Sequence, residues 1–193
     1  MANIDAAFGF KPVRRLDGAA WTGGHTTRKM LNTAGALNRG DVVNQLATGY
    51  VAVSAAGKTD HSNLGVFVGC HYLSAALGYP IWSNYWPGSG AVGDVEVQII
   101  DDPMVVFEVQ CSAGPFTLAN VGENVDFIVV PSTTGFSKWS ANATTGVTAT
   151  LPFCIVQLGD PAPNVGNGYD HTTPFNVVQV SWNDQFHRQM AGI

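Results

Sequence analysis

Apolar and polar residues alternate along several short segments of this chain, which is the pattern of β-strands with one buried face. The alternation is clearest at residues 94–100 and 104–110. The turn sequence Asp101-Asp102-Pro103 separates these two segments, so the pattern predicts two strands that pair antiparallel. Further strands are predicted at residues 64–72, 125–130, 147–151, 153–158 and 175–182.

Two local features refine this pattern. The apolar segments 41–46 and 50–53 flank a turn at 47–49 and predict a β-hairpin. Gly65 and Gly69 interrupt one of the predicted strands, and glycine within a strand indicates a bulge or the close approach of another backbone.

Short strands with turns between them, and no long helix-forming stretch, predict an all-β fold. The chain has 22 Gly and 10 Pro among its 193 residues, and its 46% hydrophobic content is enough for a sizeable core. We expect a β-sandwich or barrel, jelly-roll-like or β-tulip-like. The β-rich body is predicted at residues 41–193, as one domain or as two packed halves with a boundary near 74–93.

Residues 1–40 show no sustained period and are predicted to form an extended N-terminal arm. The arm has six basic and two acidic residues, whereas residues 41–193 have three basic and twelve acidic ones. This split predicts a basic arm that folds back on the acidic body or docks on an acidic neighbour. The arm lacks a sustained run of Lys and Arg, so we expect no direct binding of nucleic acid.

The segment 78–90 places Tyr79, Trp82, Tyr85 and Trp86 among turn residues, which predicts a loop with an apolar surface. Exposed Trp and Tyr side chains either anchor a protein interface or stack on a sugar ring. Few polar side chains accompany these rings, so a protein interface is the favoured interpretation.

Several segments match sequence motifs of catalytic sites but lack the neighbouring structure that such sites need. Residues 88–93 match the pattern GxGxxG, but a strand follows them instead of a helix, so we predict a glycine turn. Cys70 and His71 are adjacent, and neighbouring residues of a strand point to opposite faces, so they do not form a nucleophile and its base. The spacing of the His, Cys and carboxylate residues matches no metal site. We therefore expect a protein that is not an enzyme and has no cofactor or metal.

The cysteines and the lengths of the apolar stretches indicate the cellular compartment in which the chain folds. Cys70, Cys111 and Cys154 are odd in number and widely spaced, which argues against a secreted disulfide framework. The first residues lack the apolar run of a signal peptide, and no stretch has the length of a membrane span. We expect folding in a reducing compartment and no membrane partner.

Several segments, taken in their order along the chain, carry a resemblance to a known family. They are residues 1–13 (MANIDAAFGFKPV), 40–43 (GDVV), 64–69 (LGVFVG), 101–103 (DDP), 106–110 (VFEVQ), 121–126 (VGENVD) and 134–137 (TGFS). In this order they resemble tailed-bacteriophage virion proteins of the head decoration or cement type.

The resemblance implies a small β-rich structural protein that binds the outer surface of a phage capsid and bridges neighbouring capsid subunits. Its partners would be the major capsid protein and copies of itself, in a dimer or trimer. Its place would be the exterior of the virion, after folding in the host bacterial cytoplasm. The alternative is a carbohydrate-binding tail or receptor-recognition protein that uses the aromatic segment.

The residues predicted to bind a partner combine the basic and aromatic side chains of the arm with the aromatic segment. They are Phe8, Phe10, Lys11, Arg14, Arg15, Trp21, Trp82, Tyr85 and Trp86.

Overall fold

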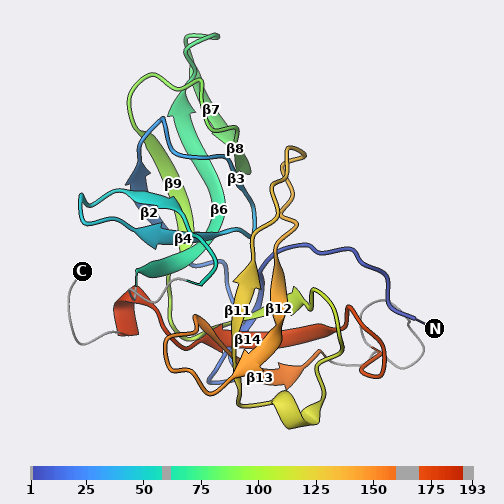
Figure 1. Ribbon diagram of the computed structural model, residues 1–193. Helices are drawn as coiled ribbons and strands as arrows, with labels where there is room; N and C mark the ends of the chain where they lie inside the picture. Colours follow the sequence, from blue (N-terminus) through green and yellow to red (C-terminus); the bar gives the residue numbers. More distant parts are fainter. Residues whose placement is uncertain (1, 58–61, 160–169, 189–193) are drawn as a thin grey trace.

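The computed structural model describes residues 2–57, 62–159 and 170–188, and its strands form two six-stranded sheets and one short pair (Figure 1). Within the described residues the only helical turns are the short 3-10 helices η1 (Leu118–Asn120) and η2 (Phe186–Arg188). The all-β class predicted from the sequence is confirmed.

The first sheet closes into a barrel. Its order is β4 (Val42–Gln45), β5 (Val51–Val53), β2 (Thr26–Met30), β9 (Val95–Ile100), β6 (Asn63–Leu73) and β7 (Pro80–Ser83). A further pairing of β4 with β6 closes five of these strands into the barrel and leaves β7 at the edge. The short pair of β3 (Leu37–Asn38) and β8 (Tyr85–Trp86) lies beside it.

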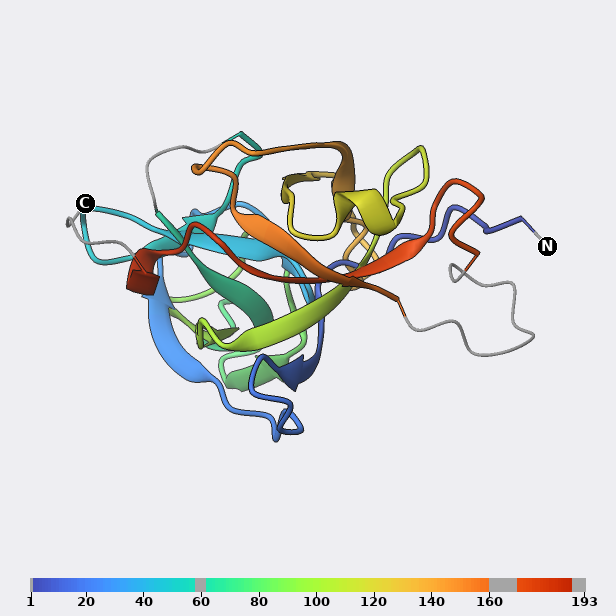
Figure 2. The same ribbon diagram turned by 90° about the horizontal axis from the view of Figure 1, so that it is seen from below.

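The second sheet is antiparallel and open. Its order is β1 (Lys11–Arg15), β10 (Val105–Gln110), β14 (Val177–Trp182), β13 (Phe153–Leu158), β11 (Asn124–Ile128) and β12 (Ser140–Gly146). Figure 2 shows β10, β14 and β13 side by side as yellow-green, red and orange strands.

Two apolar clusters hold the molecule together, and β9 contributes to both. Val97 and Ile99 are buried inside the barrel, whereas Ile100 packs in the cluster between the barrel and the second sheet. At the centre of this second cluster the ring of Phe153 stacks on Phe10 and on Trp182, each with centroids 4.4 Å apart. The barrel and the second sheet therefore pack against each other through this second cluster.

Glycine allows β6 to approach β9 closely. A Cβ atom at Gly65 would lie 2.6 Å from the carbonyl oxygen of Ile100, closer than real Cβ atoms approach. The register of β6 with β9 also shifts between Phe67 and Gly69. The predicted bulge and close approach are thus confirmed, as is the hairpin of β4 and β5.

The strands predicted at 94–100 and 104–110 exist as β9 and β10, but the prediction that they pair with each other is wrong. β9 pairs with β2 and β6 in the barrel, and β10 pairs with β1 and β14 in the second sheet. Three other predictions differ from the structure. Residues 147–151 are turns and irregular structure, and the predicted aromatic loop contains β7 and β8. The chain passes from barrel to second sheet after Ile100, whereas the predicted boundary near 74–93 falls within the barrel layer.

Residues 1–40 also differ from the extended arm that the sequence predicts. β1 is the edge strand of the second sheet, and β2 is part of the barrel. The preceding residues are tied down as well: the amide of Ala6 donates to Gln110 Oε1 over 2.9 Å, and the amide of Phe10 to Gly40 O over 2.9 Å. Burial of Phe10 and Met30 fixes this segment in the two layers.

Candidate binding surfaces

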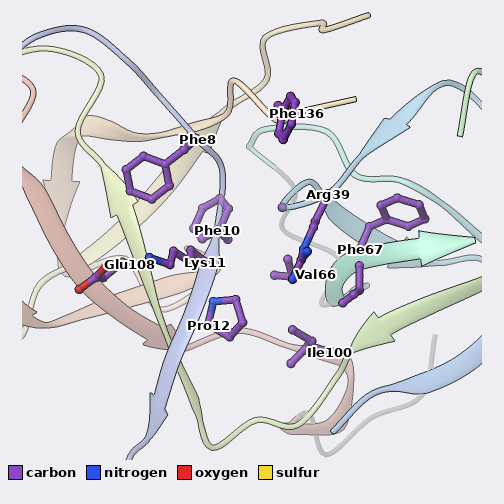
Figure 3. Close-up of a pocket in the computed structure, with 12 residues that line it drawn as sticks. Phe8, Phe10, Lys11, Pro12, Arg39, Val66, Phe67, Ile100, Glu108 and Phe136 are labelled. Atoms are coloured by element: carbon purple, nitrogen blue, oxygen red, sulfur yellow. The ribbon is translucent and has the colours of Figure 1, made fainter. Parts of the chain in front are cut away.

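A groove of about 530 Å³ lies between the barrel and the second sheet (Figure 3). We call it the interlayer groove. Its lining comes from β1 and the residues before it, from the loops after β3 and β11, and from β6, β9 and β10. The lining residues are Phe8, Phe10, Lys11, Pro12, Arg39, Gly40, Val66, Phe67, Val68, Ile100, Glu108 and Phe136.

The groove is apolar at its floor and open at its rim. Phe10, Val66 and Ile100 are buried there, whereas Phe8 and Phe136 are 37% and 67% exposed. A pocket of this volume, lined mainly by apolar side chains, is of the size and kind that proteins use for binding. No described part of the chain fills it.

Two glycines let the chain form one wall. A Cβ at Gly9 would lie 2.5 Å from Ser137 Cβ and 2.8 Å from Gly40 O, so residues 8–10 pass close to both neighbouring loops. Gly9 also has a φ of 75°, a conformation that glycine adopts at little cost. This passage sets Phe8 at the rim and Phe10 in the floor (Figure 3).

The groove also presents charge. Lys11 and Arg39 are exposed, and Glu108 lies opposite Lys11 in the pairing of β1 with β10. Among the described residues none of these three side chains takes part in an ion pair. Figure 3 shows Lys11 and Arg39 on opposite sides of the groove. An apolar floor with two uncommitted cations suits a guest that is apolar and acidic.

A second apolar surface covers the hairpin of β6 and β7 and the segments next to it. This aromatic hairpin surface comprises Leu73, Leu77, Tyr79, Trp82, Tyr85 and Val92, which are 40%, 54%, 55%, 69%, 41% and 55% exposed. The hairpin extends at the end of the barrel that is far from the second sheet (Figure 1). Exposed apolar side chains grouped in this way mark interaction sites on soluble proteins.

The Trp82 ring is held in place on this surface. It stacks on His71 with centroids 4.1 Å apart, and His71 Nδ1 lies 3.7 Å from Glu96 Oε2. The three residues are neighbours in the paired strands β7, β6 and β9. The indole is therefore an ordered, outward-facing platform.

Two of the predicted partner-binding residues are buried. Trp86 is 0% exposed and lies in the core, whereas Phe10 is 2% exposed and forms part of the floor of the interlayer groove. Trp86 Nε1 donates to Ala34 O over 3.2 Å, and its ring packs against Tyr72. A buried ring with a satisfied N–H is a core residue.

The arginines of the predicted arm are used within the chain. Arg14 donates to Gln179 and Gln157, and Arg15 pairs with Asp102 and Asp17. Trp21 is half-buried against the cluster between the layers. Of the predicted partner-binding residues, Phe8, Lys11, Trp82 and Tyr85 are exposed, the first two at the groove and the others on the aromatic hairpin surface.

The thiols lie in environments that oppose nucleophilic chemistry. Burial raises the pKa of Cys70 to about 12, and its Sγ donates to Tyr85 O over 3.3 Å. Burial also raises the pKa of Cys111 and of Cys154. A thiol must ionise to act as a nucleophile, so none of these is activated.

The glycine-rich segment 88–93 does not open a helix. Residues 88–93 form a turn before β9, with positive φ at Gly88, Gly90 and Gly93. In the described ranges, no three His, Cys, Asp or Glu side chains gather as a metal site would require. Nor does any helix there have the length and apolarity to cross a membrane.

Comparison of the chain with protein-family models, with curated proteins and with solved structures finds no match. The interlayer groove itself was missed by the sequence analysis. Its lining comes from separate segments that only the fold brings together, although Phe8 and Lys11 were among the predicted contacts.

Proposed function

We propose that this chain is a structural virion protein that binds the outer surface of a tailed-bacteriophage capsid and cements neighbouring capsid subunits. The proposal joins the resemblance of its ordered sequence segments to the physical character of its surface. The observation that carries it is the presence of two apolar surfaces that no described residue covers, the interlayer groove and the aromatic hairpin surface, which border each other at Val68.

A cement protein must make at least two contacts at once, because it joins subunits to one another. The groove lies between the two layers, and the hairpin lies at the far end of the barrel (Figure 1). Contacts at both places would therefore reach different neighbours. Aromatic side chains of the kind found at both surfaces are enriched among residues that carry binding energy.

The low charge of the chain agrees with a covered surface. Only 12% of its residues are charged, about half the share of a typical soluble protein. The central part of a protein interface characteristically contains few charged residues. The partners in this proposal are the major capsid protein and copies of the chain itself, on the virion exterior.

A non-enzymatic role is part of the proposal. The buried thiols with raised pKa support it, because they remove the candidates for a cysteine nucleophile. Two β layers packed on buried apolar clusters suit a mechanical role.

The test is an add-back experiment with particles that lack the chain. We expect the purified protein to sediment with these particles and to raise the temperature at which they release DNA. Arg39→Glu at the groove and Trp82→Ser on the hairpin should each weaken both effects. The matched control Leu118→Ser, at a side chain 79% exposed elsewhere, should not. Failure of the wild-type protein to sediment with particles would refute the proposal.

One observation favours a second candidate, a carbohydrate-binding tail or receptor-recognition protein. Trp82 borders a shallow hollow that also contains Asn84 and Gln98, and neither amide has a hydrogen-bond partner among the described residues. An aromatic platform beside free amides suits a neutral sugar. Binding on a glycan array that is lost with Trp82→Ala would support this candidate. Unchanged particle binding by Trp82→Ser, together with such a signal, would favour it over the cement role.

A further inference from the structure

The interlayer groove and the aromatic hairpin surface complement each other. We propose that the groove of one copy binds the β6–β7 hairpin of a second copy, so that copies join head to tail. This inference concerns the purified chain alone and does not rest on the virion role.

The groove and the hairpin complement each other in shape. The groove is a hollow of about 530 Å³, and the hairpin is a projection that carries Leu77 and Tyr79 at 54% and 55% exposure. Figure 1 places the tip of this hairpin far from the second sheet, on which one wall of the groove is built. A chain therefore does not insert its own hairpin, and the guest comes from another molecule.

The hairpin and the floor of the groove are both apolar. Residues 73–93, which form the hairpin and the following turn, contain no charged residue. Their exposed Leu and Tyr side chains would exchange water for the apolar floor formed by Phe10, Val66 and Ile100. No charge would have to be buried at the centre of the contact.

The edges of the groove and of the hairpin carry charged residues. The uncommitted cations Lys11 and Arg39 belong to the groove, whereas the residues that follow the hairpin include Asp94 and Glu96. No Lys or Arg occurs anywhere between residues 59 and 137. Glu96 lies opposite Lys29 in the pairing of β9 with β2, so Asp94 is the carboxylate next to the hairpin that is left to face the cations of the groove.

The same charges select the mode of assembly. A groove facing a second groove would bring together two cations, Lys11 and Arg39, and one acid, Glu108, from each copy, and a hairpin facing a hairpin would bring Asp94 of two copies together. Like charges placed opposite each other disfavour both symmetric contacts. A hairpin in a groove pairs opposite charges, and repetition of this contact gives a ring if the rotation closes.

Two variants of the full chain separate the two sides of this contact. The tip variant carries Leu77→Ser and Tyr79→Ser, and the groove variant carries Arg39→Glu and Phe136→Ser. All four side chains are exposed, so both variants should fold, as circular dichroism would verify. The control carries Leu118→Ser and Val147→Ser, at apolar side chains 79% and 93% exposed elsewhere.

The measurement is sedimentation velocity over a range of protein concentrations. We expect the wild type and the control to form oligomers, and each surface variant alone to associate at least about tenfold more weakly, as loss of central interface residues does. An equal mixture of the two variants should form a dimer and nothing larger. The intact groove of the tip variant then binds the intact hairpin of the groove variant. The substituted surfaces of this dimer prevent a third copy from adding.

Three results would overturn the inference: a wild type that stays monomeric at every concentration, variants that associate as the wild type does, or a mixture that remains monomeric. Oligomers that form as expected in a protein that fails to sediment with particles would refute the virion role alone. The two proposals therefore fail separately.

Discussion

Ile100 ends β9 in the barrel and Val105 begins β10 in the second sheet, so the short segment between them joins the two layers. Asp101 organises this joint. Its carboxylate accepts hydrogen bonds from Thr26 over 2.8 Å and from Arg28 over 3.1 Å, and it lies 3.3 Å from His187 Nε2. Strand β2, the joint and the C-terminal η2 therefore meet at one buried carboxylate.

Replacement of this carboxylate should weaken the fold at neutral pH. We expect Asp101→Asn to lower the free energy of unfolding by about 1–3 kcal/mol, because it breaks charge-assisted hydrogen bonds at a buried site. Urea denaturation at pH 7 measures the change. The control Asp17→Asn removes an exposed carboxylate paired with Arg15 and should have little effect.

The same carboxylate predicts a dependence on pH. Burial favours its neutral form, but hydrogen bonds from Thr26, Arg28 and His187 outweigh burial and lower the pKa of Asp101 below its usual 3.8. Its contribution to stability is complete above the unfolded-state pKa and is lost as the pH falls through the lower folded-state pKa. The stability difference between wild type and Asp101→Asn should therefore shrink below about pH 4. A difference that stays constant down to pH 2 would contradict this.

Gly65 offers a test of the close approach of β6 and β9. In Gly65→Ala the new Cβ would meet Ile100 O at 2.6 Å, so β6 and β9 must separate. We expect a loss of about 1–3 kcal/mol in the free energy of unfolding, as for other overpacked sites. At the control site, Gly114, a Cβ would meet nothing within 4 Å. Equal effects of the two substitutions in thermal and urea unfolding would show that the close approach does not matter.

Phe153 tests the cluster between the layers. Its ring contacts those of Phe10, Phe107, Phe127 and Trp182. We expect Phe153→Ala to cost about 3–5 kcal/mol of unfolding free energy, because it leaves a cavity that rigid neighbours do not fill.

The matched substitution for that site is Phe136→Ala, at a phenylalanine 67% exposed on the groove rim. It should leave the free energy of unfolding nearly unchanged while it weakens association. Denaturant titrations of both variants, with sedimentation of the second, measure the two effects. A large loss of stability at Phe136 would argue against its role as an uncovered rim residue.

The thiols give a chemical test of burial. Cys70 and Cys111 are 1% and 0% exposed, and burial raises the pKa of both, that of Cys70 to about 12. We expect neither to react with an alkylating reagent at pH 8 until the protein unfolds, because the thiolate is the reactive form. Peptide mass spectrometry after timed labelling follows each site. Rapid alkylation of native Cys70 would contradict its placement and reopen nucleophilic chemistry there.

Alternation located β6, β9, β10, β11, β13 and β14, but it missed β12 and the strands within residues 1–40, and it did not identify strand partners. The alternating residues of β9 and β10 identified both strands, yet their separation by a short turn suggested a hairpin. Alternation records which side of a strand is buried and carries no information about its neighbour. Asp101 bonds to residues of β2 at one end of the joint, which the local sequence does not reveal.

The aromatic residues show the same limit. Trp82 and Trp86 lie in one short segment, yet one is 69% exposed and the other is fully buried. The difference comes from the pairing of β8 with β3, which places Trp86 against Ala34 and Tyr72. The basic residues of 1–40 predicted an arm that folds back on the acidic body or docks on an acidic neighbour, and the ion pairs of Arg15 and Arg28 with acids in the joint after β9 agree with the first alternative.

The central claim is that this chain is a capsid cement, and its copy number in purified virions tests that claim most directly. Quantitative mass spectrometry of intact particles gives the ratio of this chain to the major capsid protein. A protein that bridges capsid subunits over the whole shell should be present at a simple, large fraction of the capsid copy number. A ratio that matches only the vertices or the tail, or absence from the particle, would contradict the account.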